Sequence, residues 1–215
     1  MGSTSVNVNN IQALEMIYGE LAKVLALTNF SLNRKKEGFI RQINGGWQEI
    51  GVPFYPDRFE FSLVVTIRLD AVERISHMFS GSPLEYHSDT VSTIIQLEHF
   101  TLGPTEFAVT NAQDIQNAIA VLEPVIHDRI LPFLEKHQDI VSLDCMLNRC
   151  IPSVDTSFHP YRGMSAIIAA KMAGNPEFER LVAQYANEMN AMPTPDREKF
   201  NRLAEYLKAD LPATF

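Results

Sequence analysis

The chain has 215 residues, of which 46% are hydrophobic and 20% charged, enough to bury a sizeable core in one large domain or in a main domain with a smaller appendage. It has no apolar run of about 18 residues, and its first five residues lack the basic and apolar regions of an export signal, so we expect a cytoplasmic protein with no membrane span. The formal net charge of −8 and the pI near 5.2 argue against nucleic acid as the main partner.

The N-terminal segment predicts an amphipathic helix. Apolar side chains recur at the three-four spacing that places them on one helix face, and Asn9 or Asn10 is available as the N-cap. The members of this stripe are Ile11, Leu14, Ile17, Tyr18, Leu21 and Leu25. We expect the helix to end near Thr28.

The next segment predicts antiparallel strands. Two extended runs, 38–43 and 47–52, flank Asn44-Gly45, and such a pair is the strongest short-range signal for a β-hairpin. Apolar and polar residues then alternate from Phe59 to Leu69. This period of two predicts one long strand with one face on a core and the other toward water or a partner.

A short helix over 71–79 is expected next, with Asp70 as its N-cap. Residues 91–101 and 106–110 then predict a second hairpin, and Gly103-Pro104 would form its turn. We therefore expect the sheet to grow by two further strands that pair with each other.

The rest of the chain predicts helices. An apolar stripe from Ile115 to Leu134 indicates a long helix, in which Pro124 should produce a kink because proline lacks an amide hydrogen. Further helices are expected at about 140–149, 164–172, 178–189 and 200–207. Residues 151–161 contain two prolines and no periodicity, and predict a linker.

These elements predict an α+β fold. It consists mainly of an antiparallel sheet of about five or six strands with an N-terminal helix and a long packing helix, followed by a helical C-terminal unit. We place an α+β domain at 1–150 and a helical extension at 151–215. The only two cysteines, Cys145 and Cys150, lie five apart in a predicted helix, where side chains point to different faces, so we expect two free thiols.

Charge is concentrated in one segment. Ten of the 26 carboxylates fall between Glu85 and Asp144, against two basic residues, Arg129 and Lys136. A concentrated negative field captures basic partners, although carboxylates scattered over a solvated face would simply keep the protein in solution. The candidate partner-binding residues are Glu85, Asp89, Glu98, Glu106, Asp114, Glu123 and Asp128.

Metal binding and catalysis receive less support. In an extended segment the alternating Glu85, His87 and Asp89 would share one side, and Glu98 with His99 falls near the end of a predicted strand. The metal-ligand candidates are thus His87, Asp89 and His99, but alternating polar residues are also typical of a solvated strand edge. The sequence contains no nucleophile elbow and no phosphate-binding loop, so we assign no catalytic residue and no cofactor.

Two short motifs carry a family resemblance. The stretch Gly38-Phe39-Ile40-Arg41 follows a basic run, and Ile130-Leu131-Pro132-Phe133-Leu134-Glu135 closes the long helix. Over residues 10–140 this pattern resembles a group of small uncharacterised bacterial domains, some of which sit beside secreted toxins and are thought to be immunity proteins. The resemblance implies a protein that occupies the basic active surface of a toxin.

The leading hypothesis is therefore a non-catalytic, acidic binding protein, an immunity protein that neutralises a basic toxin domain. One alternative is an enzyme of unassigned type, with His87, Asp89, Glu98 and His99 around a metal or small-molecule pocket. A second alternative is a self-associating structural module, in which the exposed side of the sheet pairs with a second copy to form a homodimer.

Overall fold

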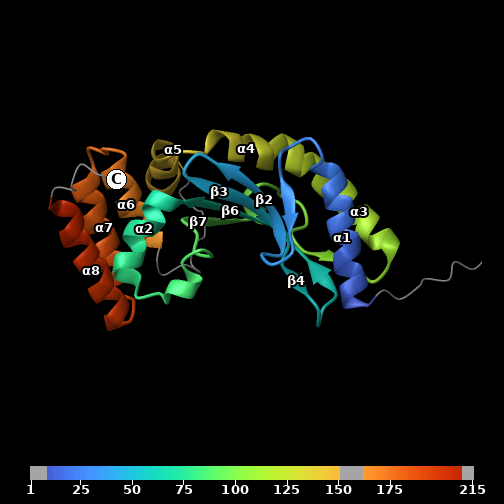
Figure 1. Cartoon of the computed structure of the whole chain (residues 1–215), viewed down its shortest axis with the longest axis horizontal. Helices are drawn as coiled ribbons and strands as arrows, with labels where there is room; N and C mark the ends of the chain where they lie inside the picture. The colour runs from blue at the N-terminus through green and yellow to red at the C-terminus, as the bar shows by residue number, and fades with distance from the viewer. Residues whose placement is uncertain (1–8, 151–161, 210–215) are drawn as a thin grey trace, which may run out of the picture. The chain divides into compact units, whose positions relative to one another are not determined.

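The structure, a computed structural model, describes residues 9–150 and 162–209 (Figure 1). Within these ranges the fold is α+β, as the sequence predicts, with a five-stranded antiparallel sheet in the order β1-β2-β3-β6-β7 and a three-stranded sheet in the order β4-β5-β8. The predicted linker at 151–161, and with it the predicted domain boundary, lies outside the described residues. None of the described helices is long and apolar enough to cross a membrane.

The strands are short and the helices vary in length. The strands are β1 Ser31–Asn33, β2 Gly38–Ile43, β3 Gly46–Gly51, β4 Phe54–Tyr55, β5 Glu60–Phe61, β6 Val64–Leu69, β7 Thr93–Gln96 and β8 Phe107–Ala108. The α-helices are α1 Asn10–Val24, α2 Asp70–Ser80, α3 Ala112–Val125, α4 Leu131–Lys136, α5 Ile140–Cys145, α6 Arg162–Met172, α7 Phe178–Met189 and α8 Thr194–Lys208. Two 3-10 turns, η1 Leu84–Tyr86 and η2 Leu97–His99, and two π-helical turns, η3 Ile126–Ile130 and η4 Met146–Cys150, complete the elements.

The chain divides into two compact units. Unit 1 comprises residues 1–42, 48–66 and 95–135. Unit 2 comprises residues 43–47, 67–94 and 136–215.

Helix α1 forms as the sequence predicts and belongs to the core of unit 1. Asn9 caps it in a capping box, in which its side chain accepts a hydrogen bond from the amide of Gln12 at 2.9 Å. Ile17 and Leu21 are fully buried where α1 packs against α3 and β1. The helix ends at Val24, because the chain then enters a turn instead of continuing to Thr28.

The predicted hairpin around Asn44-Gly45 is confirmed. β2 and β3 are neighbours in the sheet, and Gly45 has a φ of +74°, a left-handed conformation that favours glycine. Gly46 is needed for a different reason, since a Cβ built there would lie 1.9 Å from the carbonyl oxygen of Arg68. The turn thus depends on two glycines with separate roles.

The long strand predicted from Phe59 to Leu69 is wrong in one respect. It is broken at Ser62 and Leu63 into β5 and β6, which belong to different sheets. The odd-numbered residues from Phe61 to Leu69 are buried as predicted, but on β6 the even-numbered Thr66 and Arg68 are buried as well. Alternation of residue type therefore located one buried face and could not show that the other face is covered too.

The second predicted hairpin is also wrong. β7 belongs to the five-stranded sheet, whereas β8 pairs with β5, where Phe61 lies opposite Phe107. The rings of these two phenylalanines lie 5.6 Å apart, centroid to centroid. Their contact gives β8 a hydrophobic partner that is distant in sequence, which local turn signals cannot reveal.

The long C-terminal helix of unit 1 is interrupted near Pro124 as predicted, but the interruption is a π-helical turn. Helix α3 begins after Asn111, whose side chain accepts hydrogen bonds from the amides of Gln113 and Asp114, and Pro124 lies in its last turn. The π-helical turn η3 follows directly, and α4 continues from it. A π-turn next to a proline accommodates the lost hydrogen bond without ending the helix.

A buried arginine holds α4 in unit 1. Arg41 on β2 donates from Nε to Gln48 Oε1 at 2.8 Å and forms an ion pair with Glu135. Gln48 in turn donates to the carbonyl of Leu134 at 2.8 Å, and the Arg41 guanidinium lies 4.9 Å from the ring centroid of Phe30. These contacts fix the helical segment that carries η3.

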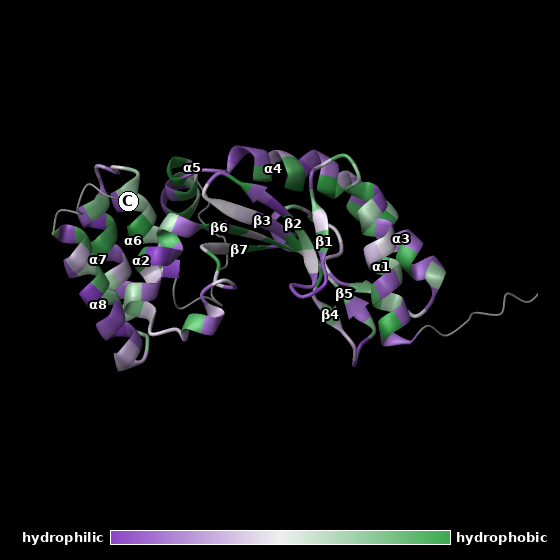
Figure 2. Cartoon of the chain, in the orientation of Figure 1, coloured by the Kyte–Doolittle hydropathy of each residue, from purple (hydrophilic) through white to green (hydrophobic). Residues whose placement is uncertain are grey.

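Unit 2 is mainly helical. Helix α6 is buried from Gly163 to Ala170 and packs against α2, α5, α7 and α8. In Figure 2, α7 and α8 alternate between green and purple along their length, as expected of amphipathic helices at the surface of a bundle. Helix α8 begins at Thr194, with Pro195 in its first turn, where the fixed torsion of proline suits a helix.

The expectation of free thiols is wrong, because Cys145 is disulfide-bonded. The prediction assumed that Cys145 and Cys150 lie in one α-helix. In the structure α5 ends at Cys145, and the π-helical turn η4, whose hydrogen bonds join residues five apart, follows it. Disulfides persist mainly in oxidising compartments, so this bond gives no support to the cytoplasmic location, which stays a prediction.

A buried polar network joins α5, η4, α6 and α7 in unit 2. Both oxygens of Asp144 accept hydrogen bonds from Asn175 Nδ2, at 3.0 and 2.9 Å, and Oδ1 also accepts from Asn148 Nδ2 at 2.8 Å. Asn148 Nδ2 also donates to the carbonyl of Ala166 at 3.0 Å, and Tyr185 OH donates to Asn148 Oδ1 at 3.1 Å. Asp144 and Asn175 are both nearly inaccessible to solvent.

We predict that Asp144→Ala lowers the free energy of unfolding by about 2–4 kcal/mol, because it leaves two amide groups without their charged acceptor in a buried place. Urea denaturation followed by circular dichroism measures this change. Glu179→Ala, which removes an exposed carboxylate of α7, is the matched control and should change the unfolding free energy by less than about 1 kcal/mol. Equal effects of the two substitutions would contradict the network.

Glu49 in unit 1 is an unusual buried carboxyl group. It is 8% exposed, its Oε1 makes no hydrogen bond with any described residue, and burial raises its pKa to about 7 against the opposing effect of Lys36. A folded-state pKa above the unfolded value means that the folded chain holds this proton more tightly. The contribution of Glu49 to stability is therefore lost as the pH rises from about 4.5 to about 7.

Glu49→Gln should accordingly stabilise the protein more at pH 8 than at pH 5. We expect the difference in unfolding free energy between variant and wild type to grow by about 1–3 kcal/mol over this interval, because glutamine does not ionise. Denaturation curves at the two pH values provide the measurement. A difference that is constant with pH would show that Glu49 titrates normally in the folded protein.

Candidate functional site

The seven predicted carboxylates do not all lie in one unit. Glu85 and Asp89 belong to unit 2, and the other five belong to unit 1. Of those five, two are already engaged. Glu106 is held by both terminal nitrogens of Arg58, at 3.1 and 3.2 Å, and Asp114 accepts hydrogen bonds at the start of α3 from Thr110 and Asn111.

The remaining three carboxylates of unit 1 are free to meet a partner. Glu98, Glu123 and Asp128 are exposed, and none of them forms an ion pair or hydrogen bond with another residue of 9–150 or 162–209. Two of them, Glu98 and Asp128, line a pocket of about 650 Å³. The predicted set thus reduces to a smaller group around one cavity.

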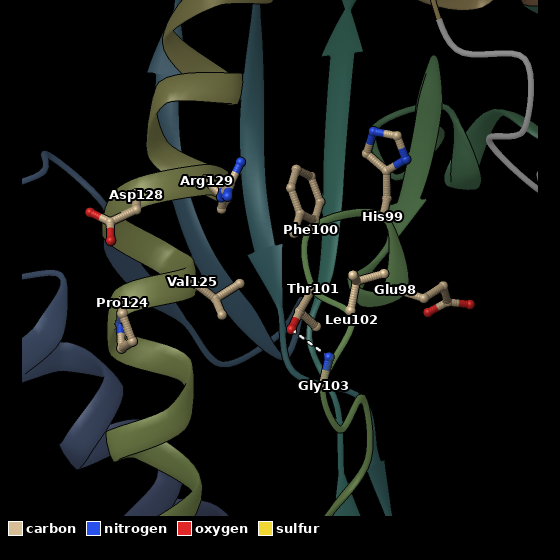
Figure 3. Close-up of a pocket in the computed structure, with 10 residues that line it drawn as sticks. All are labelled: Glu98, His99, Phe100, Thr101, Leu102, Gly103, Pro124, Val125, Asp128 and Arg129. Atoms are coloured by element: carbon tan, nitrogen blue, oxygen red, sulfur yellow. Dashed lines mark hydrogen bonds between the residues drawn. The ribbon is translucent and has the colours of Figure 1, made fainter.

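We call this cavity the loop–helix pocket (Figure 3). One wall is the segment from Glu98 to Gly103, and the other is the junction of α3 and η3, which contributes Pro124, Val125, Asp128 and Arg129. Figure 3 shows Val125 facing the loop residues Thr101 and Leu102, while the carboxylates of Glu98 and Asp128 lie on opposite sides and point away from each other. The pocket has the apolar side chains of Val125 and Leu102 between two acidic groups, and Arg129 adds a cation on the helical wall.

Local structure explains the shape of both walls. The predicted extended segment at Glu98-His99 is wrong, since these residues form the 3-10 turn η2 and the chain turns again where Gly103 N donates to Thr101 Oγ1 at 2.9 Å. Pro124 and the π-turn η3 widen the helix at the facing residues. Leu102 is fully exposed at the rim, so an apolar side chain is presented to solvent beside the cavity.

A second, smaller cavity lies within unit 2, and we call it the serine pocket. It has a volume of about 240 Å³. Its lining residues come from α2, from the segment after α2, and from α6. They are Glu73, Ser76, His77, Ser80, Ser82, Asp89, Thr90, Val91 and Ser165.

The segment that carries Glu85, His87 and Asp89 is not extended, which corrects the geometry on which their alternation depended. It forms η1 and a following turn, in which the amides of His87 and Asp89 donate to the carbonyls of Leu84 and Tyr86. His87 and Asp89 still end at one site, because the His87 ring stacks on that of His77 at 3.7 Å and Asp89 lines the serine pocket. Glu98 and His99 belong to the other unit.

The four residues of the enzyme hypothesis are therefore divided between two pockets. His99 in unit 1 packs edge-on against the rings of Phe100 and Phe133, at centroid distances of 5.3 and 6.1 Å. Among the residues that the structure describes, no three His, Cys, Asp or Glu side chains are grouped so that they could hold a metal ion.

Sequence reasoning missed Glu73, Ser76, His77 and Ser80. All four lie on α2 at positions i, i+3, i+4 and i+7, which is the spacing of one helix face. The signal was therefore present as a polar stripe, opposite the apolar residues of the same helix. A stripe of this kind is ordinarily read as the solvated face, and here three of its four members are buried.

The electrostatics of the serine pocket follow from burial. Burial raises the pKa of Glu73, and hydrogen bonds from Thr90 and Ser92 oppose this effect, with Ser92 Oγ at 2.9 Å from Glu73 Oε1. Burial, together with the neighbouring His87 and Arg68, lowers the pKa of His77 to about 4. His77 is consequently neutral at physiological pH, with Nε2 at 2.7 Å from Thr90 Oγ1.

No protein-family model, curated protein or solved structure matches this chain. The resemblance of residues 10–140 to immunity-protein domains therefore stays a prediction.

We predict that the His77 imidazole does not titrate between pH 5 and pH 8. Its pKa lies near 4, so the unfolded chain takes up a proton at this side chain as the pH falls below 6.5 and the folded chain does not. Stability conferred by the neutral ring is thus lost as the pH falls from 6.5 toward 4. Nitrogen chemical shifts of the histidine rings measure this directly, and a His77 midpoint near 6.5 would contradict the buried, neutral assignment.

Proposed function

We propose that unit 1 is a non-catalytic binding module that docks a basic protein on the loop–helix pocket. The observation that carries this proposal is a cavity that presents the apolar side chains of Leu102 and Val125 between two exposed carboxylates, Glu98 and Asp128, which lack partners among the described residues. A segment with an apolar side chain between two basic ones fits this arrangement, because the apolar group fills the middle and each cation meets one flank.

The charge of unit 1 supports a basic partner. The unit holds twelve Asp and Glu against seven Lys and Arg, a formal net charge of −5. Near the pocket Arg129 offsets one charge, while Glu123 on α3 adds another exposed carboxylate to the same helical segment. Such a field raises the association rate of a cationic protein, and salt screens it within about 8 Å at physiological ionic strength.

The side chains of the loop–helix pocket favour binding over chemistry. The hydroxyl of Thr101 is engaged by the amide of Gly103, and the ring of His99 packs on two phenylalanines. Neither group is paired with a base or a nucleophile in the lining, which is the arrangement that general acid–base or covalent catalysis requires.

We extend the proposal to a toxin domain as the basic partner, which makes the protein an immunity protein. The resemblance carried by Gly38-Phe39-Ile40-Arg41 and by the Leu-Pro-Phe-Leu-Glu stretch ending at Glu135 supports this step. An immunity protein has to compete for the surface that a toxin uses on nucleic acid, and exposed carboxylates imitate phosphate charge there.

The double variant Glu98→Gln/Asp128→Asn tests the proposal. Its affinity for the probe peptide Arg-Gly-Leu-Gly-Arg should be lower than that of the wild type by about three- to tenfold, since each exposed ion pair contributes up to about 1 kcal/mol. Amide chemical shifts in titrations at low and high salt give the dissociation constants and locate the binding residues. Raising the salt concentration should weaken wild-type binding in the same direction.

Glu106→Gln provides the control, because Glu106 is already paired with Arg58. This substitution should change the affinity for the peptide by less than about twofold. A peptide with serine in place of leucine tests the apolar middle and should bind more weakly. Equal affinity of wild type and double variant, or affinity that does not change with salt, would exclude the loop–helix pocket as the docking surface. Failure of the protein to protect cells from a toxin encoded beside it, despite normal peptide binding, would exclude only the immunity role.

A further inference from the structure

The serine pocket of unit 2 is lined by the hydroxyl groups of two buried serines that have no hydrogen-bond partner among the residues the structure describes. Ser76 on α2 is 6% exposed and Ser165 on α6 is 3% exposed, and both line the cavity. No hydrogen bond joins either side chain to another residue of 9–150 or 162–209. Most buried polar groups in folded proteins are hydrogen-bonded, so two unpartnered hydroxyls that face one cavity indicate a polar occupant.

The charges of the lining indicate which polar occupant fits. The cavity is lined by two carboxyl groups, Glu73 and Asp89, and by no lysine or arginine. The nearest guanidinium, Arg68, is committed elsewhere, because it donates to Asp70 at 2.7 Å and to the carbonyls of His87 and Thr90 at 2.8 and 2.7 Å. The remaining groups of the lining are mostly hydroxyls, which accept hydrogen bonds as readily as they donate them.

A primary ammonium group is the complement of such a lining. It carries a positive charge and three hydrogen-bond donors but no acceptor, so carboxylate and hydroxyl oxygens satisfy it completely. The volume of about 240 Å³ lies below the range of drug-sized ligand sites and limits the occupant to a small molecule.

We propose that the serine pocket binds a small primary amine, whose ammonium group donates to the hydroxyls of Ser76 and Ser165 and to a carboxyl oxygen of Glu73. Asp89, nearer the surface, adds a second negative charge at the cavity. Thr90 and His77 hold the facing wall, since His77 Nε2 lies 2.7 Å from Thr90 Oγ1. This site is separate from the loop–helix pocket and does not depend on the function proposed for unit 1.

Three probes of similar size separate the possible occupants. Ethanolamine has the ammonium group, choline has the same charge without an N–H donor, and ethylene glycol has donors without the charge. We expect ethanolamine to bind with one-site stoichiometry and to raise the melting temperature of the full chain in a saturable way. Choline and ethylene glycol should bind at least about tenfold more weakly, as expected when hydrogen bonds to a charged group are lost.

Ser76→Ala and Ser165→Ala each remove one unpartnered hydroxyl and nothing on which another described side chain depends. Each should weaken ethanolamine binding about tenfold and leave the melting temperature of the free protein unchanged or slightly higher. Glu85→Gln removes an exposed carboxylate of the same unit that does not line the cavity, and it should leave ethanolamine binding unchanged.

Three outcomes would overturn the proposal. Binding of choline or ethylene glycol with the affinity of ethanolamine would show that the site does not recognise an ammonium group. Absence of binding by all three probes would show that the cavity holds water only. Unchanged ethanolamine binding in both serine variants would place the amine elsewhere. The Glu98→Gln/Asp128→Asn variant should retain full ethanolamine binding, so the two proposals fail independently.

Discussion

The side chain of Arg68 is the constraint on which the serine pocket depends. It lies on the face of β6 that the alternating sequence assigned to solvent, yet it is 9% exposed. Its nitrogens bind the carboxylate of Asp70 and the carbonyls of His87 and Thr90, and hydrogen bonds to a charged group contribute about 1.5–3 kcal/mol each. Because Arg68 fastens the segment from His87 to Thr90, it keeps that segment beside α2 and so forms the cavity wall.

The same arginine also shapes the electrostatics of the pocket. Its positive charge opposes protonation of His77, and burial and the stacked ring of His87 act in the same direction. A neutral imidazole adds no positive charge to the lining, which holds the carboxyl groups of Glu73 and Asp89. Arg68, which does not line the cavity, thus helps to keep His77 in the lining neutral.

The sequence predicted most of the local structure, because local structure depends on nearby residues. An N-cap at Asn9 or Asn10, the turn at Asn44-Gly45 and the interruption near Pro124 were all predicted from signals within a few positions, and the structure places the cap at Asn9. The errors arose where distant residues decide the outcome. β8 pairs with β5 through Phe61 and Phe107, which are 46 positions apart, and no turn signal between neighbours reports such a contact.

The site was harder to predict than the fold for a related reason. The distribution of charged residues along the chain identified Glu98 and Asp128 as candidates. It could not show that Glu106 forms an ion pair with Arg58, because these residues are 48 positions apart in the sequence. The polar stripe on α2 was present in the sequence, and it was indistinguishable from a solvated face until α6 placed Ser165 against it. Burial, and not residue type, turned this stripe into a candidate site.

The two pockets differ in the physics that makes them selective. At the loop–helix pocket the carboxylates are exposed, so their attraction reaches a partner over several ångströms, weakens with salt and contributes more to the rate of encounter than to affinity. In the serine pocket Ser76 and Ser165 are buried residues, so the proposed selectivity rests on hydrogen bonds to their hydroxyls, and a ligand that lacks a donor should bind more weakly. The proposed macromolecular partner would therefore be selected by charge and the proposed small molecule by donor geometry, and the two proposals rest on different residues in different units.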